Sequence, residues 1–235
     1  MRTIGTGSTT SLRSGATNTI PIVFVTGVDP VRTGLVASLN HPGGNLTGVT
    51  TLDVQLGPKL LEVLHQVMPN TARVAVLVNP ANPAGPIQAT DLRSAASSLG
   101  LVLDILNAAS EREIDAGFAS LAELQIGALL ISSDAFFNSQ CERFAALASR
   151  YGVKAISLYR EFPAAGGLMS YGTSIADLYR QAALYTGRIL KGEKPADLPI
   201  LQATKFELVV NLKAARTLGL TLPQSVLLRA DEVVR

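Results

Sequence analysis

The sequence Arg73-Val74-Ala75-Val76-Leu77-Val78-Asn79-Pro80 begins the most regular part of the chain, where a short apolar run ends in a polar turn. The run has the length of a buried strand, and Asn-Pro is a turn signal. Comparable runs begin near residues 102, 128 and 154, and helical spacing follows each one. Strands that alternate with helices in this way predict right-handed crossovers and a parallel sheet. A barrel of eight such units needs about 250 residues, and the number of units here falls short.

A second apolar run, Ile20-Pro21-Ile22-Val23-Phe24-Val25, lies upstream and stops at the loop Thr26-Gly27-Val28-Asp29-Pro30. Because the run does not alternate, it predicts a strand that is covered on both faces. Pro30 is expected to start a helix that runs through Leu39. Ligands bind beyond the carboxyl ends of strands in open α/β sheets, so Thr26 and Asp29 are candidate site residues. The alternative for Asp29 is a helix N-cap.

The composition excludes several classes of function. The 235 residues are 47% hydrophobic and 16% charged, with a net charge of +2. No stretch approaches the ~18 consecutive apolar residues of a membrane-spanning helix. The charges are interspersed and form no basic face, so no nucleic-acid partner is predicted. His41 and His65 lie far apart without ligand-like spacing, so no metal site is predicted. Residues 1–4 carry no apolar core of a signal peptide.

Local signals predict how several helices begin. Ser110-Glu111-Arg112-Glu113 and Ser139-Gln140-Cys141-Glu142 both have the spacing of a capping box. Cys141 is the only cysteine, so no internal disulfide can form. Its helical setting beside Phe144 predicts a buried structural thiol.

The last third of the chain breaks the regular rhythm and predicts a second lobe. Gly166–Gly172 is a short strand bracketed by glycines, as expected for a segment that crosses between lobes. The predicted fold class is α/β, with two doubly wound parallel-sheet lobes joined by a hinge. Lobe one is assigned to residues 1–71 and 167–195, and lobe two to residues 72–166 and 196–235.

No catalytic or phosphate-binding motif is complete. No histidine accompanies Asp29, Asp134 or Glu161 to form a triad, and no nucleophile elbow is present. The loop Gly5–Thr10 departs from both the Walker and the dinucleotide patterns, so no cofactor is predicted. Its hydroxyls could either hold an anion at a helix N-terminus or form a plain capped turn. Asp134, like Asp29, is either a ligand residue or an N-cap.

Several stretches, in order along almost the whole chain, carry a family resemblance. Besides the two apolar runs they are Gly34-Leu35-Val36-Ala37-Ser38-Leu39-Asn40, Pro42-Gly43-Gly44-Asn45-Leu46-Thr47-Gly48-Val49, Gly167-Leu168-Met169-Ser170-Tyr171-Gly172, Lys205-Phe206-Glu207-Leu208-Val209-Val210-Asn211-Leu212-Lys213 and Arg229-Ala230-Asp231-Glu232-Val233. The chain resembles the ABC-transporter substrate-binding proteins of the TrpX-like group, which have the type I periplasmic-binding-protein fold.

The resemblance implies a two-lobe clamp that closes on a small-molecule solute and delivers it to an ABC permease and its ATPase. It implies a periplasmic or extracytoplasmic location and an amino-acid solute, aromatic or apolar. Hydroxyls and backbone amides would hold the solute carboxylate, an aspartate its ammonium, and tyrosines would flank its side chain. The implied ligand residues are Thr6, Ser8, Thr9, Thr26 and Asp29 on lobe one, Asn79, Ser133, Asp134 and Tyr159 on lobe two, and Tyr171 at the hinge.

One departure from the family concerns the N-terminus. Family members carry an export signal and two further βα units before the equivalent of Gly5–Thr10, so lobe one is expected to be incomplete by on the order of 60 residues. Its open sheet edge would invite a homodimer. Two alternative functions stay open, an enzyme that uses Asp29 or Asp134 and the ligand-sensing domain of a regulator. The regulator would need a DNA-binding segment.

Overall fold

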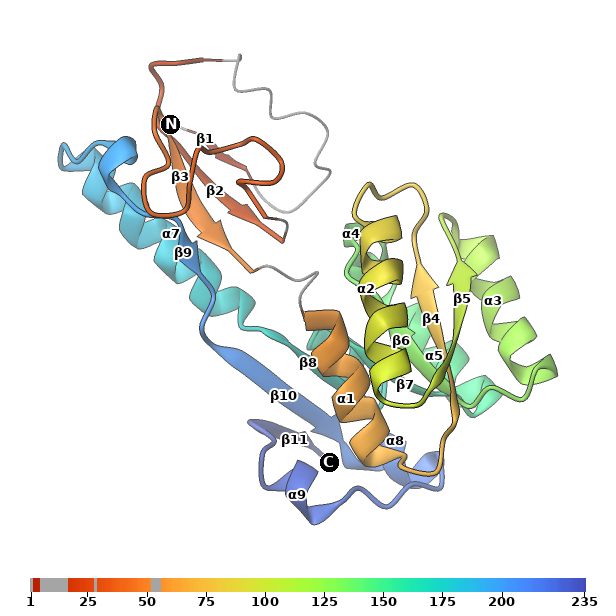
Figure 1. Cartoon of the computed structure of the whole chain (residues 1–235). Coiled ribbons are helices and arrows are strands. Elements are labelled where there is room, and N and C mark those ends of the chain that lie inside the picture. The colour runs from red at the N-terminus through yellow and green to blue at the C-terminus, as the bar shows by residue number, and fades with distance from the viewer. Residues whose placement is uncertain (1, 5–16, 28, 52–55) are drawn as a thin grey trace. The chain divides into compact units, whose positions relative to one another are not determined.

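The computed structural model describes residues 2–4, 17–27, 29–51 and 56–235, which form two compact units (Figure 1). Unit 1 comprises Met1–Asp53 and Thr173–Phe206, and unit 2 comprises Val54–Gly172 and Glu207–Arg235. The predicted α/β class with parallel sheets is confirmed. Within the described ranges, no helix is both long and apolar enough to cross a membrane.

Unit 1 is a parallel sheet with one long helix against it. The strand order is β1-β2-β3-β9, with bounds Arg2–Ile4, Ile22–Thr26, Leu46–Thr50 and Leu201–Gln202. Helix α7 (Ile175–Leu190) packs Leu178, Ala182 and Tyr185 against Val23, Val25 and Val49 on one face of the sheet. The short 3-10 helix η2 (Pro195–Asp197) follows α7. Phe24 lies on the other face with Val36 and Ile200. Because β2 is buried on both faces, its sequence shows no alternation.

The helix predicted from Pro30 to Leu39 is wrong. The chain makes a single turn that is closed at both ends. Asp29 Oδ1 accepts hydrogen bonds from Val31 N at 2.9 Å and Arg32 N at 3.2 Å. At the other end Gly34 has φ +69°, and Leu35 N donates to Pro30 O at 2.9 Å. This pattern is a Schellman motif, so Gly34 ends the helix after one turn.

Unit 2 is built on a seven-stranded sheet in the order β11-β10-β8-β7-β6-β4-β5. The strands, in chain order, are β4 (Arg73–Val78), β5 (Val102–Asn107), β6 (Ala128–Ile131), β7 (Lys154–Ser157), β8 (Met169–Thr173), β10 (Phe206–Asn211) and β11 (Glu232–Val234). The four strands predicted near residues 74, 102, 128 and 154 are confirmed within one residue of their expected starts. β8 and β10 run in opposite directions, because Asn211 N donates to Leu168 O while Ser174 N donates to Lys205 O.

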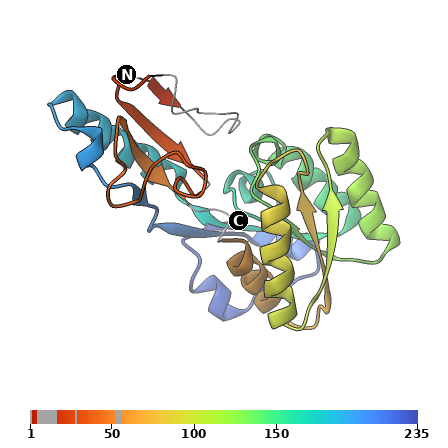
Figure 2. The same ribbon diagram turned by 45° about the horizontal axis from the view of Figure 1, so that its top comes forward.

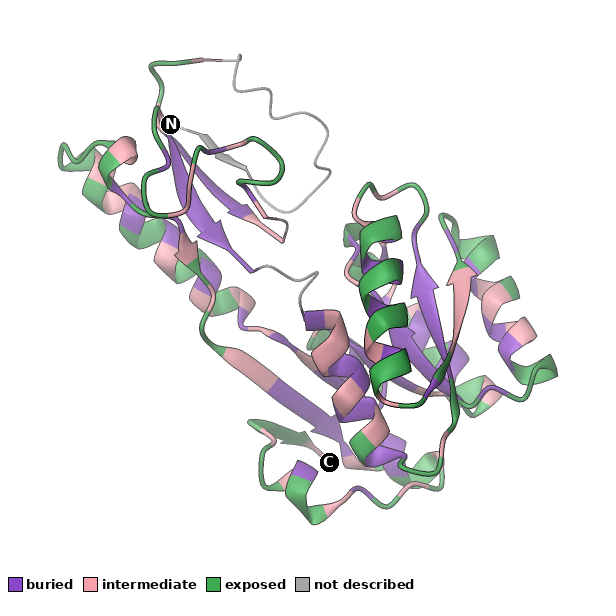
Figure 3. Ribbon diagram, viewed as in Figure 1, coloured by how far each residue is buried: buried purple, intermediate pink, exposed green. Residues whose placement is uncertain are grey.

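Helices cover both faces of the β4–β7 region in unit 2 (Figures 1 and 2). Helices α1 (Gly57–Val67) and α2 (Gly85–Ser98) lie on one face, and α3 (Glu111–Glu123) and α5 (Cys141–Tyr151) lie on the other. Figure 3 shows that the central strands β4 and β6 are buried. Short helices α4 (Ala135–Ser139), α6 (Glu161–Ala164), α8 (Leu212–Thr217) and α9 (Gln224–Leu227) complete the unit.

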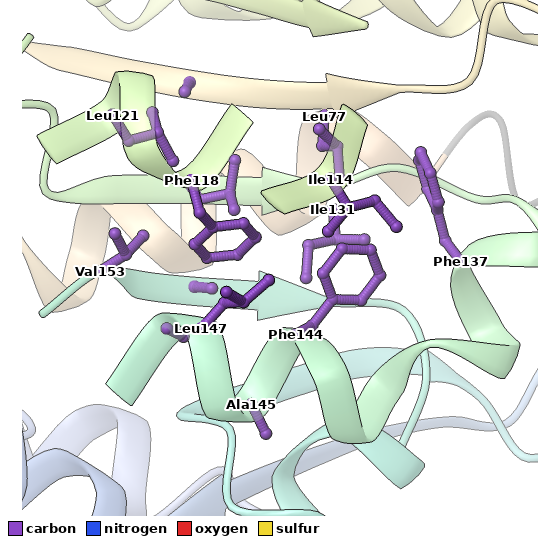
Figure 4. Close-up of a cluster of buried hydrophobic side chains, with 14 of the residues drawn as sticks. Leu77, Ile114, Phe118, Leu121, Ile131, Phe137, Phe144, Ala145, Leu147 and Val153 are labelled. Carbon is purple, nitrogen blue, oxygen red and sulfur yellow. The ribbon is translucent and has the colours of Figure 1, made fainter. Parts of the chain in front are cut away.

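Three phenylalanines form the centre of the core beneath α3 and α5 (Figure 4). The Phe137 and Phe144 rings meet edge to face, with centroids 5.6 Å apart, and Phe118 lies 6.1 Å from Phe144. Such an arrangement is the favourable one for ring quadrupoles. Cys141 is buried against the same core, and burial raises the pKa of its thiol to about 12, with Glu161 adding to the shift. It is therefore a structural thiol, as predicted.

The boundaries between the units differ from those assigned from the sequence. Helix α1 was expected in lobe one but belongs to unit 2. The segment 196–206 was expected in lobe two but belongs to unit 1. Leu60, Leu61 and Leu64 are fully buried, and α1 packs on α2, β6 and β7 of unit 2. Conversely, Leu198, Ile200 and Leu201 pack in the core clusters of unit 1, where β9 pairs with β3. Helical periodicity shows that a side is apolar, but not which sheet will cover it.

Candidate functional site

The carboxyl ends of β4, β6 and β7 mark the place in unit 2 where a ligand site is expected. The chain leaves β4 through α2 on one face of the sheet and leaves β6 toward α5 on the other. The two strands are neighbours and pair with Val76 opposite Leu130. Adjacent parallel strands whose following helices lie on opposite faces form a topological switch point, the usual ligand position in an open α/β sheet.

Asp134 lies at this switch point, and both oxygens of its carboxylate accept hydrogen bonds. It follows β6 as the N-cap of α4, where Oδ1 accepts from Phe137 N at 3.1 Å. Oδ2 accepts from Asn79 Nδ2 at 3.1 Å and from Asn82 Nδ2 at 2.9 Å. The residue is only 6% exposed. The carboxylate therefore holds the ends of β4 and β6 together.

The two asparagines that donate to Asp134 are themselves fixed by turns. Asn79 Oδ1 accepts from Ala81 N at 3.0 Å, and Asn82 Oδ1 accepts from Ala84 N at 2.9 Å. Each is an Asx turn, in which the side-chain oxygen is bound locally and the amide nitrogen points elsewhere. The turns aim both Nδ2 groups at one carboxylate oxygen. Asn82 was not among the predicted site residues, although Asn79-Pro80-Ala81-Asn82-Pro83 repeats the same turn signal.

Ser133 is fixed through its backbone by Gln88. Gln88 Nε2 donates to Ser133 O at 2.9 Å, and Ser133 N donates to Gln88 Oε1 at 2.9 Å. The glutamine is buried and belongs to α2. This reciprocal pair ties α2 to the end of β6. Sequence reasoning missed Gln88, because α2 carries several other polar residues and nothing local shows which of them has a buried partner.

Tyr159 reaches the same point from the loop that follows β7. Its hydroxyl accepts from Asp134 N and donates to Asp134 O, both at 3.2 Å. The ring packs against the phenylalanine-rich core. The structure thus brings together four of the predicted site residues, Asn79, Ser133, Asp134 and Tyr159. With Asn82 and Gln88 they form what we call the switch-point network.

The predicted residues of unit 1 have different surroundings. Thr26 ends β2, and its carbonyl oxygen accepts from Thr51 N at 2.9 Å. Asp29 is half-buried, and while its Oδ1 caps the single turn, its Oδ2 accepts no hydrogen bond from any described residue. Tyr171 is half-buried on β8. Thr6, Ser8 and Thr9 lie outside the described residues.

Metal ligands do not gather among the residues that the structure describes, since no three His, Cys, Asp or Glu side chains are placed to hold an ion. The switch-point network offers uncharged hydrogen-bonding groups arranged around one buried carboxylate, that of Asp134. Amides, a phenol and main-chain groups of this kind orient a polar ligand.

Comparison with known proteins connects this architecture to a family. The family model for ABC transporter substrate binding protein matches residues 2–234. The chain belongs to this family.

Relatives of the chain are similar along nearly all of its length. The "Tyrosine-binding protein" of Clostridioides difficile is 26% identical over 220 residues, 92% of this chain. A crystal structure of a conserved domain protein from Vibrio cholerae is 30% identical, with a TM-score of 0.82 over 93% of this chain and 73% of that one. The ABC domain from Streptococcus pneumoniae in complex with L-Trp is 26% identical, with a TM-score of 0.81 over 93% of this chain and 75% of that one. This family member spans 63% of the length of the tyrosine-binding protein.

Proposed function

We propose that this chain is the solute-binding component of an ABC uptake transporter and that its solute is an amino acid with an aromatic or apolar side chain. The observation that carries the proposal is the family membership together with two relatives whose names specify tyrosine and L-Trp. In the proposal the solute passes to a permease driven by an ATPase, outside the cytoplasm or in the periplasm.

The proposal divides the recognition of the solute by chemistry. Asp29 receives the ammonium, because its Oδ2 accepts no hydrogen bond within the described part of the chain and can accept a charge-assisted one. Tyr159 and Tyr171 flank the solute side chain, since phenol rings present both an apolar face and a polar edge. Thr6, Ser8, Thr9 and Thr26 hold the carboxylate through hydroxyl and backbone donors.

Asp134 and Asn79 have a supporting role in this proposal. Both oxygens of the Asp134 carboxylate already accept hydrogen bonds, and both polar ends of the Asn79 amide are engaged. Recruiting Asp134 to an ammonium would leave buried donors unpaired, at a cost of about 1–3 kcal/mol each. For the same reason Asp134 is unsuited to act as a catalytic acid or base, and the proposal includes no catalysis.

A thermal-shift series followed by calorimetric titration tests the proposed function. We expect L-tryptophan, L-tyrosine or L-phenylalanine to raise the melting temperature, because a ligand that binds only the folded state adds about 2.7 kcal/mol at a hundred times its Kd. N-acetyl-L-tyrosine, which lacks the ammonium, and tyramine, which lacks the carboxylate, are matched controls that should bind far more weakly. Equal shifts from the controls would contradict the proposed recognition, and a response only to sugars or anions would contradict the solute class.

A further inference from the structure

The loop between β7 and α6 is held in place on both sides of Tyr159. It consists of Leu158, Tyr159 and Arg160, and we call it the Tyr159 loop. The Tyr159 hydroxyl accepts from Asp134 N and donates to Asp134 O. The residues on either side of Tyr159 contact β8, β10 and β11, which lie on the side of β7 away from β6. The position of the hydroxyl therefore depends on contacts outside the switch-point network.

Leu158 makes the first of these contacts, through its main chain, with Gly172 of β8. A Cβ added at Gly172 would lie 1.9 Å from Leu158 O and 2.9 Å from its carbonyl carbon. Only a glycine allows two backbones to come this close. Because Ser157 of β7 lies opposite Ser170 of β8, Gly172 is beside the Tyr159 loop where the loop leaves the sheet.

Arg160 makes the second contact, with carboxylates on two neighbouring strands. Its Nη2 donates to Glu232 Oε2 of β11 at 2.5 Å, and its Nη1 lies 3.6 Å from Glu207 Oε2 of β10. The Glu207 side chain is 17% exposed, whereas the Arg160 and Glu232 side chains are each 49% exposed. A planar guanidinium between two carboxylates has a defined orientation. The end of the Tyr159 loop is thus fixed against β10 and β11.

Both contacts lie at points where the chain passes from one unit to the other. Gly172 is the last residue of unit 2 before the chain enters unit 1, and Glu207 is the first residue after it returns. The Tyr159 loop belongs to unit 2 as well, so all of these contacts lie within one unit. A three-residue loop therefore connects a residue of the proposed solute site to two of the segments that lead to unit 1.

We propose that Arg160 is a positioning residue for the solute site. Together with Gly172 it holds the Tyr159 loop so that the tyrosine hydroxyl stays bonded to the main chain of Asp134. The consequence for the solute rests on the proposed function, in which Tyr159 flanks the solute side chain, but the positioning itself can be measured without a solute. Because the ion pair of Arg160 with Glu232 is half exposed, we expect a modest effect of about threefold.

Hydrogen exchange of two neighbouring main-chain amides, followed by NMR, tests the positioning. The Asp134 N–H donates to the Tyr159 hydroxyl, whereas the Ser133 N–H donates to Gln88 Oε1. Arg160→Ala should speed exchange at Asp134 about threefold relative to exchange at Ser133, because only the Asp134 amide depends on the Tyr159 loop. A general loss of stability would speed both amides equally. That result, or no change at either amide, would overturn the proposal.

Two further variants test whether the ion pairs of Arg160 are responsible. Glu232→Gln removes the shorter ion pair from the acidic side and should reproduce the faster exchange at Asp134. Arg143→Ala is the matched control, because Arg143 also pairs with two carboxylates, those of Glu111 and Asp115, but joins α5 to α3. It should leave the ratio of the two exchange rates unchanged. The same change in Arg143→Ala as in Glu232→Gln would contradict a specific role of Arg160.

A double-mutant cycle tests whether Arg160 acts through the Tyr159 hydroxyl. In Tyr159→Phe the Asp134 amide has already lost this acceptor, so adding Arg160→Ala should not speed its exchange further. A second increase of the same size would show that Arg160 acts by another route and would contradict the proposal.

Calorimetric titration of L-tyrosine separates this proposal from the proposed function. Arg160→Ala should weaken binding about threefold, and Arg143→Ala should leave it unchanged. A parent chain that binds no amino acid, but whose Arg160→Ala variant shows the faster exchange at Asp134, contradicts the proposed function and supports the positioning role. A parent chain that binds L-tyrosine, with unchanged exchange at Asp134 in Arg160→Ala, contradicts the positioning role alone.

Discussion

Asp29 and Asp134 both follow a buried parallel strand and both act as caps, but they differ in how much of the carboxylate the protein itself uses. Asp134 in unit 2 accepts three hydrogen bonds through both oxygens, from one main-chain and two side-chain donors. Asp29 in unit 1 accepts two main-chain hydrogen bonds, both through Oδ1. The extra donors at Asp134 come from the turn after the neighbouring strand β4. An aspartate at a strand end is therefore a candidate ligand residue. Whether its carboxylate remains available to a ligand depends on the donors that follow the neighbouring strand.

The largest expected difference between the two aspartates is in stability. Asp134→Ala leaves the amide groups of the buried Asn79 and the half-buried Asn82 without an acceptor and removes the cap of α4, so it should lower the free energy of unfolding by about 3 kcal/mol. Asp29→Ala removes one cap of a single turn and should cost about 1 kcal/mol. Urea denaturation measures both. Similar losses in the two variants would contradict the assignment of Asp134 to the framework.

Two glycines near these aspartates extend the comparison. An added Cβ at Gly85 would overlap the carbonyl oxygen of Asn79, so Gly85→Ala should cost about 2 kcal/mol by pushing α2 away from the switch point. Gly34 has open space but φ +69°, and Gly34→Ala should cost about 1 kcal/mol for the left-handed backbone. The melting temperatures of the two variants will show which one is less stable. A larger loss for Gly34→Ala than for Gly85→Ala would contradict the prediction, because it would mean that the start of α2 can shift to accommodate the added methyl group.

Cys141 provides a local probe of the same contrast, because it begins α5 directly after the helix that Asp134 caps. With its pKa raised to about 12 by burial, the folded thiol stays protonated at pH 8 and reacts only after local opening. Asp134→Asn presents an amide group to the donors of Asn79 and Asn82, and it should speed labelling of Cys141 about tenfold, since a local loss of 1.4 kcal/mol is a tenfold change. Asp29→Asn should leave the rate unchanged. Equally faster labelling of Cys141 in both variants would contradict the prediction, because it would mean that a change in unit 1 promotes local opening in unit 2.

A small effect within the switch-point network is expected at Tyr159. Tyr159→Phe keeps the ring in the core but removes the hydroxyl that bonds to both main-chain groups of Asp134, and the expected loss is about 1 kcal/mol. Denaturant unfolding will measure it. A loss of 3 kcal/mol would place Tyr159, rather than Asp134, at the centre of the switch-point network.

The sequence predicted strands and strand ends better than it predicted helix starts. The capping box at Ser110 is present, since Glu113 N donates to Ser110 Oγ at 3.3 Å, and the Glu113 carboxylate accepts from Ala109 N, which lowers its pKa. The box predicted at Ser139 is wrong, because Asp134 already caps α4 five residues earlier and Ser139 Oγ instead donates to Phe136 O. Asp134 and Ser139 both have the sequence signal of a helix N-cap. Asp134 is the one that caps a helix, because it directly follows the end of β6.

Partners across the sheet are what sequence reasoning could not supply. The family resemblance assigned Asn79, Ser133, Asp134 and Tyr159 to lobe two, and the structure brings these four residues together. Sequence reasoning did not identify Asn82 or Gln88, since their importance comes from contacts 52 and 45 residues away along the chain. Helix α1 was also assigned to the wrong lobe, because the apolar side of a helix does not show which sheet it packs against.

Calorimetric titration of the same amino acid into the parent chain, Asp29→Asn and Asp134→Asn tests the central claim most directly. The account predicts that Asp29→Asn weakens binding of L-tyrosine or L-tryptophan by about tenfold to hundredfold, the value of a charge-assisted hydrogen bond, while its melting temperature stays near that of the parent. Asp134→Asn should lower the melting temperature and, while folded, retain most of the affinity. Unchanged affinity in Asp29→Asn together with lost affinity in a folded Asp134→Asn would contradict the account.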